Sequence, residues 1–265
     1  MSAGDRIYAA YSQLHIAVTM FLCGYHAEEV APVTEECYNE ARSWSSASNT
    51  NLMASGMVRV VKALQGRTYT DTPQVFDGDD GFNDEHFISE CYKESTHPKV
   101  PHSWYESFKI IALVLYGHID AAIETGYFCY ENIDSHPCHK HLRVMLCYFS
   151  LALVAKLRDD DDLSPELRAK YRKQIEINQQ LVDDWAVHSH INYRMYWTFV
   201  EAELAAMDDK HDLTRTIELY EEALEQAREG NWLLEITVMH EFAGAAYERK
   251  GLRNMAYGFI SKVKR

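Results

Sequence analysis

Apolar residues recur every three or four positions along almost the whole chain, which is the spacing of one face of an α-helix. No segment shows the strict alternation of apolar and polar residues that is typical of a β-strand. The fold class is therefore predicted to be all-α. The expected helices cover about 5–23, 26–42, 49–65, 83–92, 138–156, 165–185, 191–207, 213–229, 232–250 and 252–264. Two more are expected between 92 and 138, one that starts at 103 and one that follows Gly117.

The last third of the chain has the residue spacing of a tetratricopeptide-type helical hairpin. Gly244 precedes Tyr247 by three positions, where it would let two helices approach closely, and Gly251 would end the first helix in a left-handed turn. Ala256 then begins a tight contact on the second helix. One turn earlier in the solenoid, Tyr220, Ala223 and Leu224 occupy the aromatic, small and apolar positions that such a repeat has on its second helix. Since one such hairpin cannot bury its apolar face alone, we expect a tetratricopeptide-like superhelix of about twelve helices.

Glycines mark several expected helix ends. Gly24 and Gly66 each follow an apolar helical pattern, and Gly117 and Ala122 repeat the five-residue step of the final hairpin. Pro32 lies inside the second pattern, so it must either kink that helix or delay its start.

Capping residues mark several expected helix starts. Asn83 can cap the helix over about 83–92, and Ser164 followed by Pro165 is a strong start signal. Ser103 and Glu106 have the spacing of a capping box, which predicts a helix start at 103.

The helical periodicity stops between about 66 and 83, in a segment rich in Gly, Pro, Asp and Thr. Loops of this length inside a domain are often functional. Tyr69, Val75, Phe76 and Phe82 indicate that the loop packs against the helices. We therefore expect a single helical-repeat domain over 1–265 with a long ordered loop at about 66–83.

The composition narrows the possible functions. The formal net charge of −14 disfavours nucleic acid and anionic membranes as partners. No apolar run approaches the roughly 20 residues of a membrane-spanning helix, and the N-terminus lacks a secretory signal pattern. Six cysteines without paired spacing suggest free thiols, so a cytoplasmic protein is expected.

Several segments together resemble one known family: "GDRIYAAYSQLHIAVTMFLCG", "EECYNEARSW", "RVVKALQGRTYTDTPQVFDGDDGFND", "WYESFKIIALVLYGHIDAAIETGYFCY" and "HPCHKHLRVMLCYFSLAL". They are similar to the tetratricopeptide-like helical region of fungal multidomain hybrid histidine kinases, in which kinase-like and AAA ATPase domains precede that region. A GAF domain, the histidine kinase core and a receiver follow it. The resemblance covers essentially the whole chain and is most specific in the loop around "TYTDTPQVFDGDDGFND". It implies an excised segment of an ATP-dependent kinase in phosphorelay signalling that holds none of the catalytic parts, and a possible homodimer through the parent kinase.

Candidate catalytic and metal sites fail on their spacing. An EF-hand loop starting at Asp77 would place Gly81 and Phe82 at its fifth and sixth positions, where a ligand and a glycine are needed, so Asx-turns and a helix cap explain these acids better. The segment "HPCHKH" offers His136, Cys138, His139 and His141 but no second ligand pair for zinc, and contiguous residues rarely form a nucleophilic site. The acidic run "RDDDDLSPE" is predicted to be a solvated loop, and no P-loop is present. We expect no catalytic residue, no metal and no cofactor.

The expected function is a scaffold, docking and spacer module that contacts neighbouring domains or a peptide. The loop residues Tyr69, Asp71, Asp77, Asp79 and Asp80 are the candidate partner contacts. A free-standing adaptor is one alternative. A small-molecule sensor is another, with a groove lined by Trp104, Tyr105, Tyr193 and Trp197.

Overall fold

The computed structural model describes residues 6–44, 48–95, 97–135, 140–207 and 213–263. Every regular element within these ranges is a helix, which confirms the all-α fold class. The chain divides into two compact units, one over 1–149 and one over 150–265.

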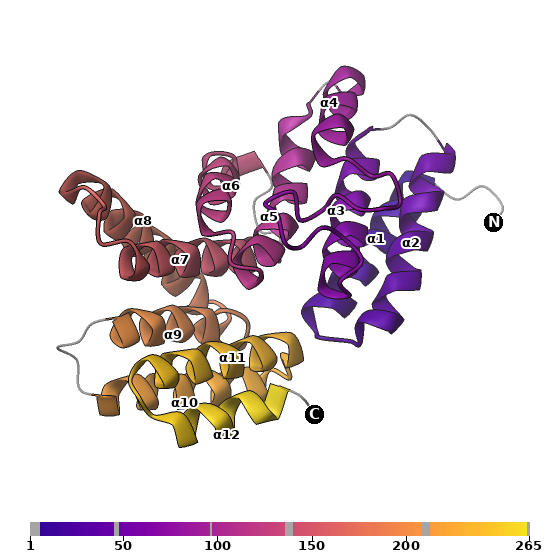
Figure 1. Ribbon diagram of the computed structural model, residues 1–265. Helices are drawn as coiled ribbons and strands as arrows, with labels where there is room; N and C mark the ends of the chain where they lie inside the picture. The colour runs from indigo at the N-terminus through magenta and orange to yellow at the C-terminus, as the bar shows by residue number, and fades with distance from the viewer. Residues whose placement is uncertain (1–5, 45–47, 96, 136–139, 208–212, 264–265) are drawn as a thin grey trace. The chain divides into compact units, whose positions relative to one another are not determined.

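The first unit is built on two helices that are buried on almost all sides. Residues 52–61 of α3 (Ser48–Leu64) are buried without interruption, and most of α5 (Lys99–Leu115) is buried as well. A helix that is apolar all round belongs in the centre of a domain. Four further helices of this unit each pack against one of these two (Figure 1). Its elements are α1 (Arg6–Leu22), α2 (Ala27–Trp44), α3 (Ser48–Leu64), α4 (Asp84–Glu94), α5 (Lys99–Leu115), α6 (Ile119–Glu131), a 3-10 turn η1 (Ile133–Ser135) and the first half of α7 (His141–Asp159).

The second unit contains successive helices that pack against their neighbours in the chain (Figure 1). They are the rest of α7, then α8 (Pro165–Ala186), α9 (His190–Met207), α10 (Leu213–Glu229), α11 (Leu233–Arg249) and α12 (Arg253–Val263). Contacts also join α9 to α11. The close approach expected at Gly244 is present, because a Cβ atom built there would lie 2.6 Å from Cγ1 of Ile260 on α12.

Helix ends follow one repeated hydrogen-bond pattern. At five of them a backbone N–H donates to the carbonyl five residues earlier, as in Leu252 to Tyr247 at 2.8 Å and His118 to Leu113 at 2.8 Å. The residue before each donor has a positive φ: Gly24, Gly66, Gly117, Asn231 and Gly251. The left-handed turn predicted at Gly251 is thus confirmed. Asn231 is the only residue other than glycine with a positive φ in the described part of the chain.

Two of the predicted helix starts are confirmed by the structure, and a third is wrong. The side chain of Asn83 accepts from the N–H of His86 at 2.9 Å, and that of Ser164 accepts from the N–H of Leu167 at 3.2 Å, so both predicted caps are confirmed. The capping box at Ser103 is wrong, because α5 already begins at Lys99. The carboxylate of Glu106, expected to take part in that box, instead lies among buried charged groups described below.

Pro32 lies inside α2, whose start at Ala27 is not delayed. Of the cysteines, Cys23, Cys37, Cys91, Cys129 and Cys147 are free thiols, as expected. Cys138 lies outside the described residues, as do His136 and His139. His141 begins α7 and is buried, with its ring centroid 4.1 Å from that of Trp104.

Candidate functional site

The segment 65–83 between α3 and α4 has no helix and is held against the first unit along its length (Figure 1). Val75 and Phe76 are fully buried, and the ring of Phe76 meets that of Tyr105 edge-on at 5.4 Å. Near the start of the loop, the carbonyl oxygen of Thr70 lies 2.9 Å from Nε2 of His118. These contacts make the loop a fixed part of the surface.

Arg59 of α3 is the main polar anchor of the loop. Its side chain is only 3% exposed, and its Nε donates to the carbonyl of Phe76 at 2.7 Å. Its Nη1 donates to Oδ2 of Asp80 at 2.6 Å, and the guanidinium lies 4.2 Å from the ring centroid of Phe82. Lys62, one turn later on α3, donates to the same carboxylate oxygen of Asp80 at 2.9 Å.

These two cations change the acidity of Asp80. Partial burial by itself raises the pKa of a carboxyl group, but the hydrogen bonds from Lys62 and Arg59 outweigh it and lower the pKa of Asp80 from 3.8 to about 2. Asp80 is therefore ionised at all ordinary pH values. The carboxylate is also an acceptor for the N–H of Phe82 at 3.3 Å, in agreement with the Asx-turn predicted for this segment.

The lowered pKa of Asp80 predicts that the loop loosens in acid. A carboxyl group with a depressed folded-state pKa contributes stability above its unfolded pKa, and that stability is lost as the pH falls toward the folded value. We expect amide exchange over 76–84 to accelerate as the pH falls from about 4 to about 2. Hydrogen–deuterium exchange, corrected for the intrinsic pH dependence of exchange, measures this.

The variant Asp80→Asn is the control for this experiment. It should exchange faster than the wild type at pH 6 and show a flatter pH response between 4 and 2. A wild-type loop that responds to acid no more than the Asp80→Asn loop would contradict the anchoring role of this carboxylate.

Asp77 and Asp84 join the end of the loop to α4. Oδ1 of Asp77 accepts from the backbone N–H of Asp84 at 2.7 Å, and Oδ2 accepts from Nδ2 of Asn83 at 3.1 Å. Asp77 is thus used to fix the start of α4. Asp84 is itself buried and accepts hydrogen bonds from the hydroxyl of Tyr105 and from Nζ of Lys109.

Lys109 connects Asp84 to further buried charged groups on α5. Its Nζ lies 3.7 Å from Oε1 of Glu106, which in turn lies 3.2 Å from Nε2 of His102. Burial lowers the pKa of Lys109, but Glu106 and Asp84 more than offset this effect, so that its pKa is raised. Burial raises the pKa of Glu106, whereas Lys109 and His102 lower it, and the net change is downward. The charges therefore stabilise one another inside the unit.

The remaining loop candidates lie on the surface. The hydroxyl of Tyr69 donates to Oδ1 of Asp79 at 2.6 Å, and its backbone N–H donates to the carbonyl of Asp77 at 2.8 Å. Tyr69 is 43% exposed, and Asp79 is exposed as well. The structure thus brings together four of the five candidates, Tyr69, Asp77, Asp79 and Asp80, while Asp71 is exposed and takes no part in these contacts.

Two adjoining hollows lie between α2, α3, the end of the loop and α4. The first has a cavity volume of about 340 Å³ and the second about 320 Å³. Four residues line both hollows: Tyr38, Arg42, Gly81 and Phe82. We call the two hollows together the α2–loop groove.

The two halves of the α2–loop groove differ in chemistry. The first hollow is polar and adds to the shared residues Glu35, Asn39, Ser55, Val58, Arg59, Lys62 and Asp80. The second contains more aromatic and amide groups and adds Asn51, Asn83, His86, Phe87, Glu90 and Cys91. Within the groove, Arg42 lies 5.5 Å from the ring centroid of Tyr38, and its Nη1 lies 3.4 Å from the Tyr38 hydroxyl.

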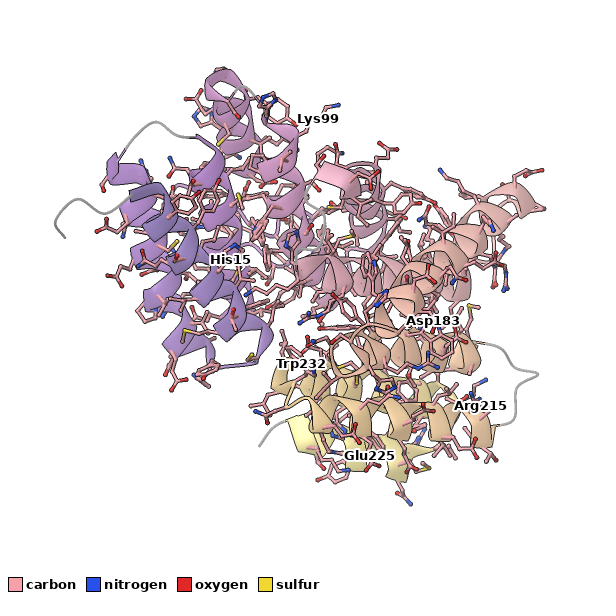
Figure 2. All side chains as sticks on the ribbon, turned by 180° about the vertical axis from the view of Figure 1, so that it is seen from behind. His15, Lys99, Asp183, Arg215, Glu225 and Trp232 are labelled. Atoms are coloured by element: carbon pink, nitrogen blue, oxygen red, sulfur yellow. The ribbon has the colours of Figure 1, made fainter. Side chains whose placement is uncertain are left out.

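Two of the four residues predicted to line a sensor groove are core residues instead. Trp104 and Tyr105 are both 0% exposed, so they offer no surface to a ligand. Tyr193 and Trp197 are partly exposed in the second unit, where the guanidinium of Arg194 lies 4.0 Å from the ring centroid of Trp197. On the same unit, Trp232, labelled in Figure 2, donates from its indole Nε1 to the carbonyl of Ile191 at 3.1 Å.

The second unit has its own buried carboxylate, Glu203 on α9. It accepts from the hydroxyl of Tyr220, and its Oε2 lies 3.3 Å from Nη1 of Arg158 and 3.9 Å from Nη2 of Arg249. Burial raises the pKa of Glu203, and the neighbouring Tyr220 and arginines only partly offset this effect. Like the charges on α5, this group is enclosed by the protein.

Two of the cysteine thiols are likewise shielded. Burial raises the pKa of the Cys37 thiol to about 11 and raises that of Cys129 further. Thiols of this kind are poor nucleophiles at neutral pH. In the described part of the chain, no three His, Cys, Asp or Glu side chains are grouped so that they could hold a metal ion.

Sequence reasoning missed the α2 side of the groove, including Tyr38, Asn39 and Arg42. It also gave no role in the site to Arg59 and Lys62, although both donate to Asp80. A signal was present, since two cations three residues apart on an otherwise apolar helix, just before an acidic loop, suggest an ion pair with that loop.

No described helix combines the length and the apolar character needed to cross a membrane. Comparisons with protein-family models, with curated proteins and with solved structures find no match to this chain.

Proposed function

We propose that this chain is a non-catalytic docking module that binds a segment of another protein, or of an adjoining domain, in the α2–loop groove. The observation that carries the proposal is the anchored loop. Loop 65–83 is fixed by buried contacts at Phe76, Arg59 and Asp84, and its far end forms one wall of an open groove. A rigid wall lowers the entropic cost of ordering a binding surface.

The distribution of ionisable groups supports docking over catalysis. Three ionisable groups enclosed by the protein, Asp84, Lys109 and Glu203, are paired with protein partners; Asp84 and Glu203 are buried, and the Lys109 side chain is only 14% exposed. A general acid or base needs contact with its substrate, and these side chains offer none. The α2–loop groove, in contrast, presents side chains that are typical of interfaces, including Tyr38, Arg42 and Phe82.

We further propose that α9–α12 form two tetratricopeptide-like hairpins. Support comes from the positive φ of Gly251 and from the burial of Ala256, which both match the predicted spacing. The close approach of Ile260 to Gly244 and the contacts between α9 and α11 are also typical of stacked hairpins.

The cellular context rests on the resemblance of the sequence alone. We propose the helical spacer of a cytoplasmic hybrid histidine kinase, in which the module would contact the neighbouring ATPase, kinase-like or sensor domains. Sequencing the reading frame on both sides of this segment tests that context. An ATPase domain before it and a GAF domain after it would support the assignment, and unrelated flanking sequence would contradict it.

Filling the α2–loop groove tests the docking function. Asn39 is exposed on α2 and lines the first hollow, so Asn39→Trp should block the groove without disturbing the core. Asn254→Trp is the matched control, since Asn254 is an exposed asparagine on α12. We expect chemical cross-linking in cells to capture partners with the wild type and with Asn254→Trp but not with Asn39→Trp. Equal capture by all three proteins would contradict the proposal.

A further inference from the structure

We infer that the α2–loop groove binds a short acidic segment of a partner protein, with a partner carboxylate at Arg42 and an apolar side chain against Phe82 and Phe87. This inference rests on the proposed docking function and adds the chemistry of the partner. It follows from the charges of the first hollow and from the apolar surface of the second.

The first hollow is locally positive in a strongly negative protein. It is lined by three cations, Arg42, Arg59 and Lys62, and by only two carboxylates, Glu35 and Asp80. The net charge of the whole chain is −14. Because exposed charges are screened beyond about 8 Å at physiological ionic strength, the local cations determine which group binds in the hollow.

Arg42 is the cation available to a partner. Arg59 and Lys62 already share the carboxylate of Asp80, at 2.6 and 2.9 Å. Arg42 is exposed, and among the described residues no carboxylate lies within ion-pair distance of it. Its position beside the Tyr38 ring restricts the guanidinium, and a restricted guanidinium suits two-point hydrogen bonding to a carboxylate.

The second hollow supplies an apolar surface beside this cation. The rings of Phe82 and Phe87 lie 5.1 Å apart, and Cys91 lines the same hollow. Since Arg42 and Phe82 line both hollows, one extended segment could reach the cation and the rings together. Such a segment carries an acidic residue next to a large apolar one.

The negative charge of the rest of the chain limits the length of this segment. A long acidic stretch would be repelled by the exposed carboxylates outside the groove. The best ligand is therefore a short stretch with one or two acidic residues. The carboxylate that lines the second hollow, Glu90, is paired with Lys93 at 2.7 Å, so Arg42 remains the unpaired charge that would repel a basic segment.

Fluorescence polarisation with labelled heptapeptides tests the inference. All three peptides have a central Leu-Phe pair. The flanking residues are Asp and Glu in the acidic peptide, Asn and Gln in the neutral peptide, and Lys in the basic peptide. We expect the acidic peptide to bind most tightly. Arg42→Gln should weaken its binding about tenfold, because it removes a charge-assisted hydrogen bond.

Lys99→Gln is the matched control, because Lys99 is an exposed cation at the start of α5, labelled in Figure 2, and lines neither hollow. It should leave the affinity unchanged. Equal binding of the three peptides, tighter binding of the basic peptide, no binding at millimolar concentration, or equal affinity of Arg42→Gln and wild type would each overturn the inference. If partner capture is lost in Asn39→Trp but not in Arg42→Gln, the docking function holds and the acidic specificity fails.

Discussion

Replacing Asp84 with alanine is expected to destabilise the first unit by about 3–5 kcal/mol, the range seen when one partner of a buried ion pair is removed. Asp84 is 4% exposed and accepts hydrogen bonds from Tyr105 and Lys109. Its loss would leave a buried hydroxyl and a buried ammonium without their acceptor. Glu106, at 3.7 Å from Lys109, and the more distant Asp77 only partly compensate.

Urea denaturation measures this effect, and hydrogen–deuterium exchange locates it. Exchange should increase over 65–94 and along α5, because Asp84 joins the loop and α4 to that helix. Asp71→Ala is the control, since Asp71 is an exposed acid of the same loop and should change stability by less than about 0.5 kcal/mol. If Asp84→Ala costs no more than Asp71→Ala, the anchoring role of Asp84 is wrong.

Replacing Glu203 with alanine is expected to destabilise the second unit by about 3 kcal/mol. Glu203 is 2% exposed, and its carboxylate accepts from Tyr220 and faces Arg158. Removing it leaves the Tyr220 hydroxyl without this acceptor and creates a cavity between α9 and α10. Glu203→Gln keeps the volume and one acceptor oxygen, so it should cost less.

The same two methods test this prediction in the second unit. Exchange should rise in residues 150–265, with a smaller change elsewhere. Glu241→Ala on the exposed face of α11 is the matched control, with an expected change of less than about 0.5 kcal/mol. Equal stability of the Glu203→Ala and Glu241→Ala proteins would show that the buried carboxylate does not stabilise this unit.

The helices could be predicted from the sequence because their signals are local. Gly24, Gly66 and Gly251 end their helices with a positive φ, and Asn83 and Ser164 cap the starts of α4 and α8. Each of these signals depends on a few neighbouring residues. Asn231 shows the limit of such rules, because a non-glycine residue takes the left-handed position there.

The start of α5 was mispredicted because its charged residues serve tertiary contacts. Ser103 and Glu106 have the spacing of a capping box, yet Glu106 lies against His102 and Lys109 inside the unit. Both residues are buried in the middle of the helix. Local spacing cannot reveal that Glu106 is buried and also accepts a hydrogen bond from Thr125 on α6.

The candidate site was only partly predictable for the same reason. The loop stood out through its length and composition, but Arg42 and Phe82 line the same hollows only because the chain folds back on itself between them. The helical spacing of the aromatic residues also did not show which of them are buried in the core and which line the groove. Trp104 and Tyr105 proved to be core residues, whereas Tyr38 lines the groove.

The most direct test of the central claim is the affinity of a captured partner for three proteins: wild type, Asn39→Trp and Asn254→Trp. If the α2–loop groove is the docking site, Asn39→Trp should bind at least tenfold more weakly than the other two, with an unchanged melting temperature. Equal affinity for all three proteins would show that the partner binds elsewhere and would contradict the account.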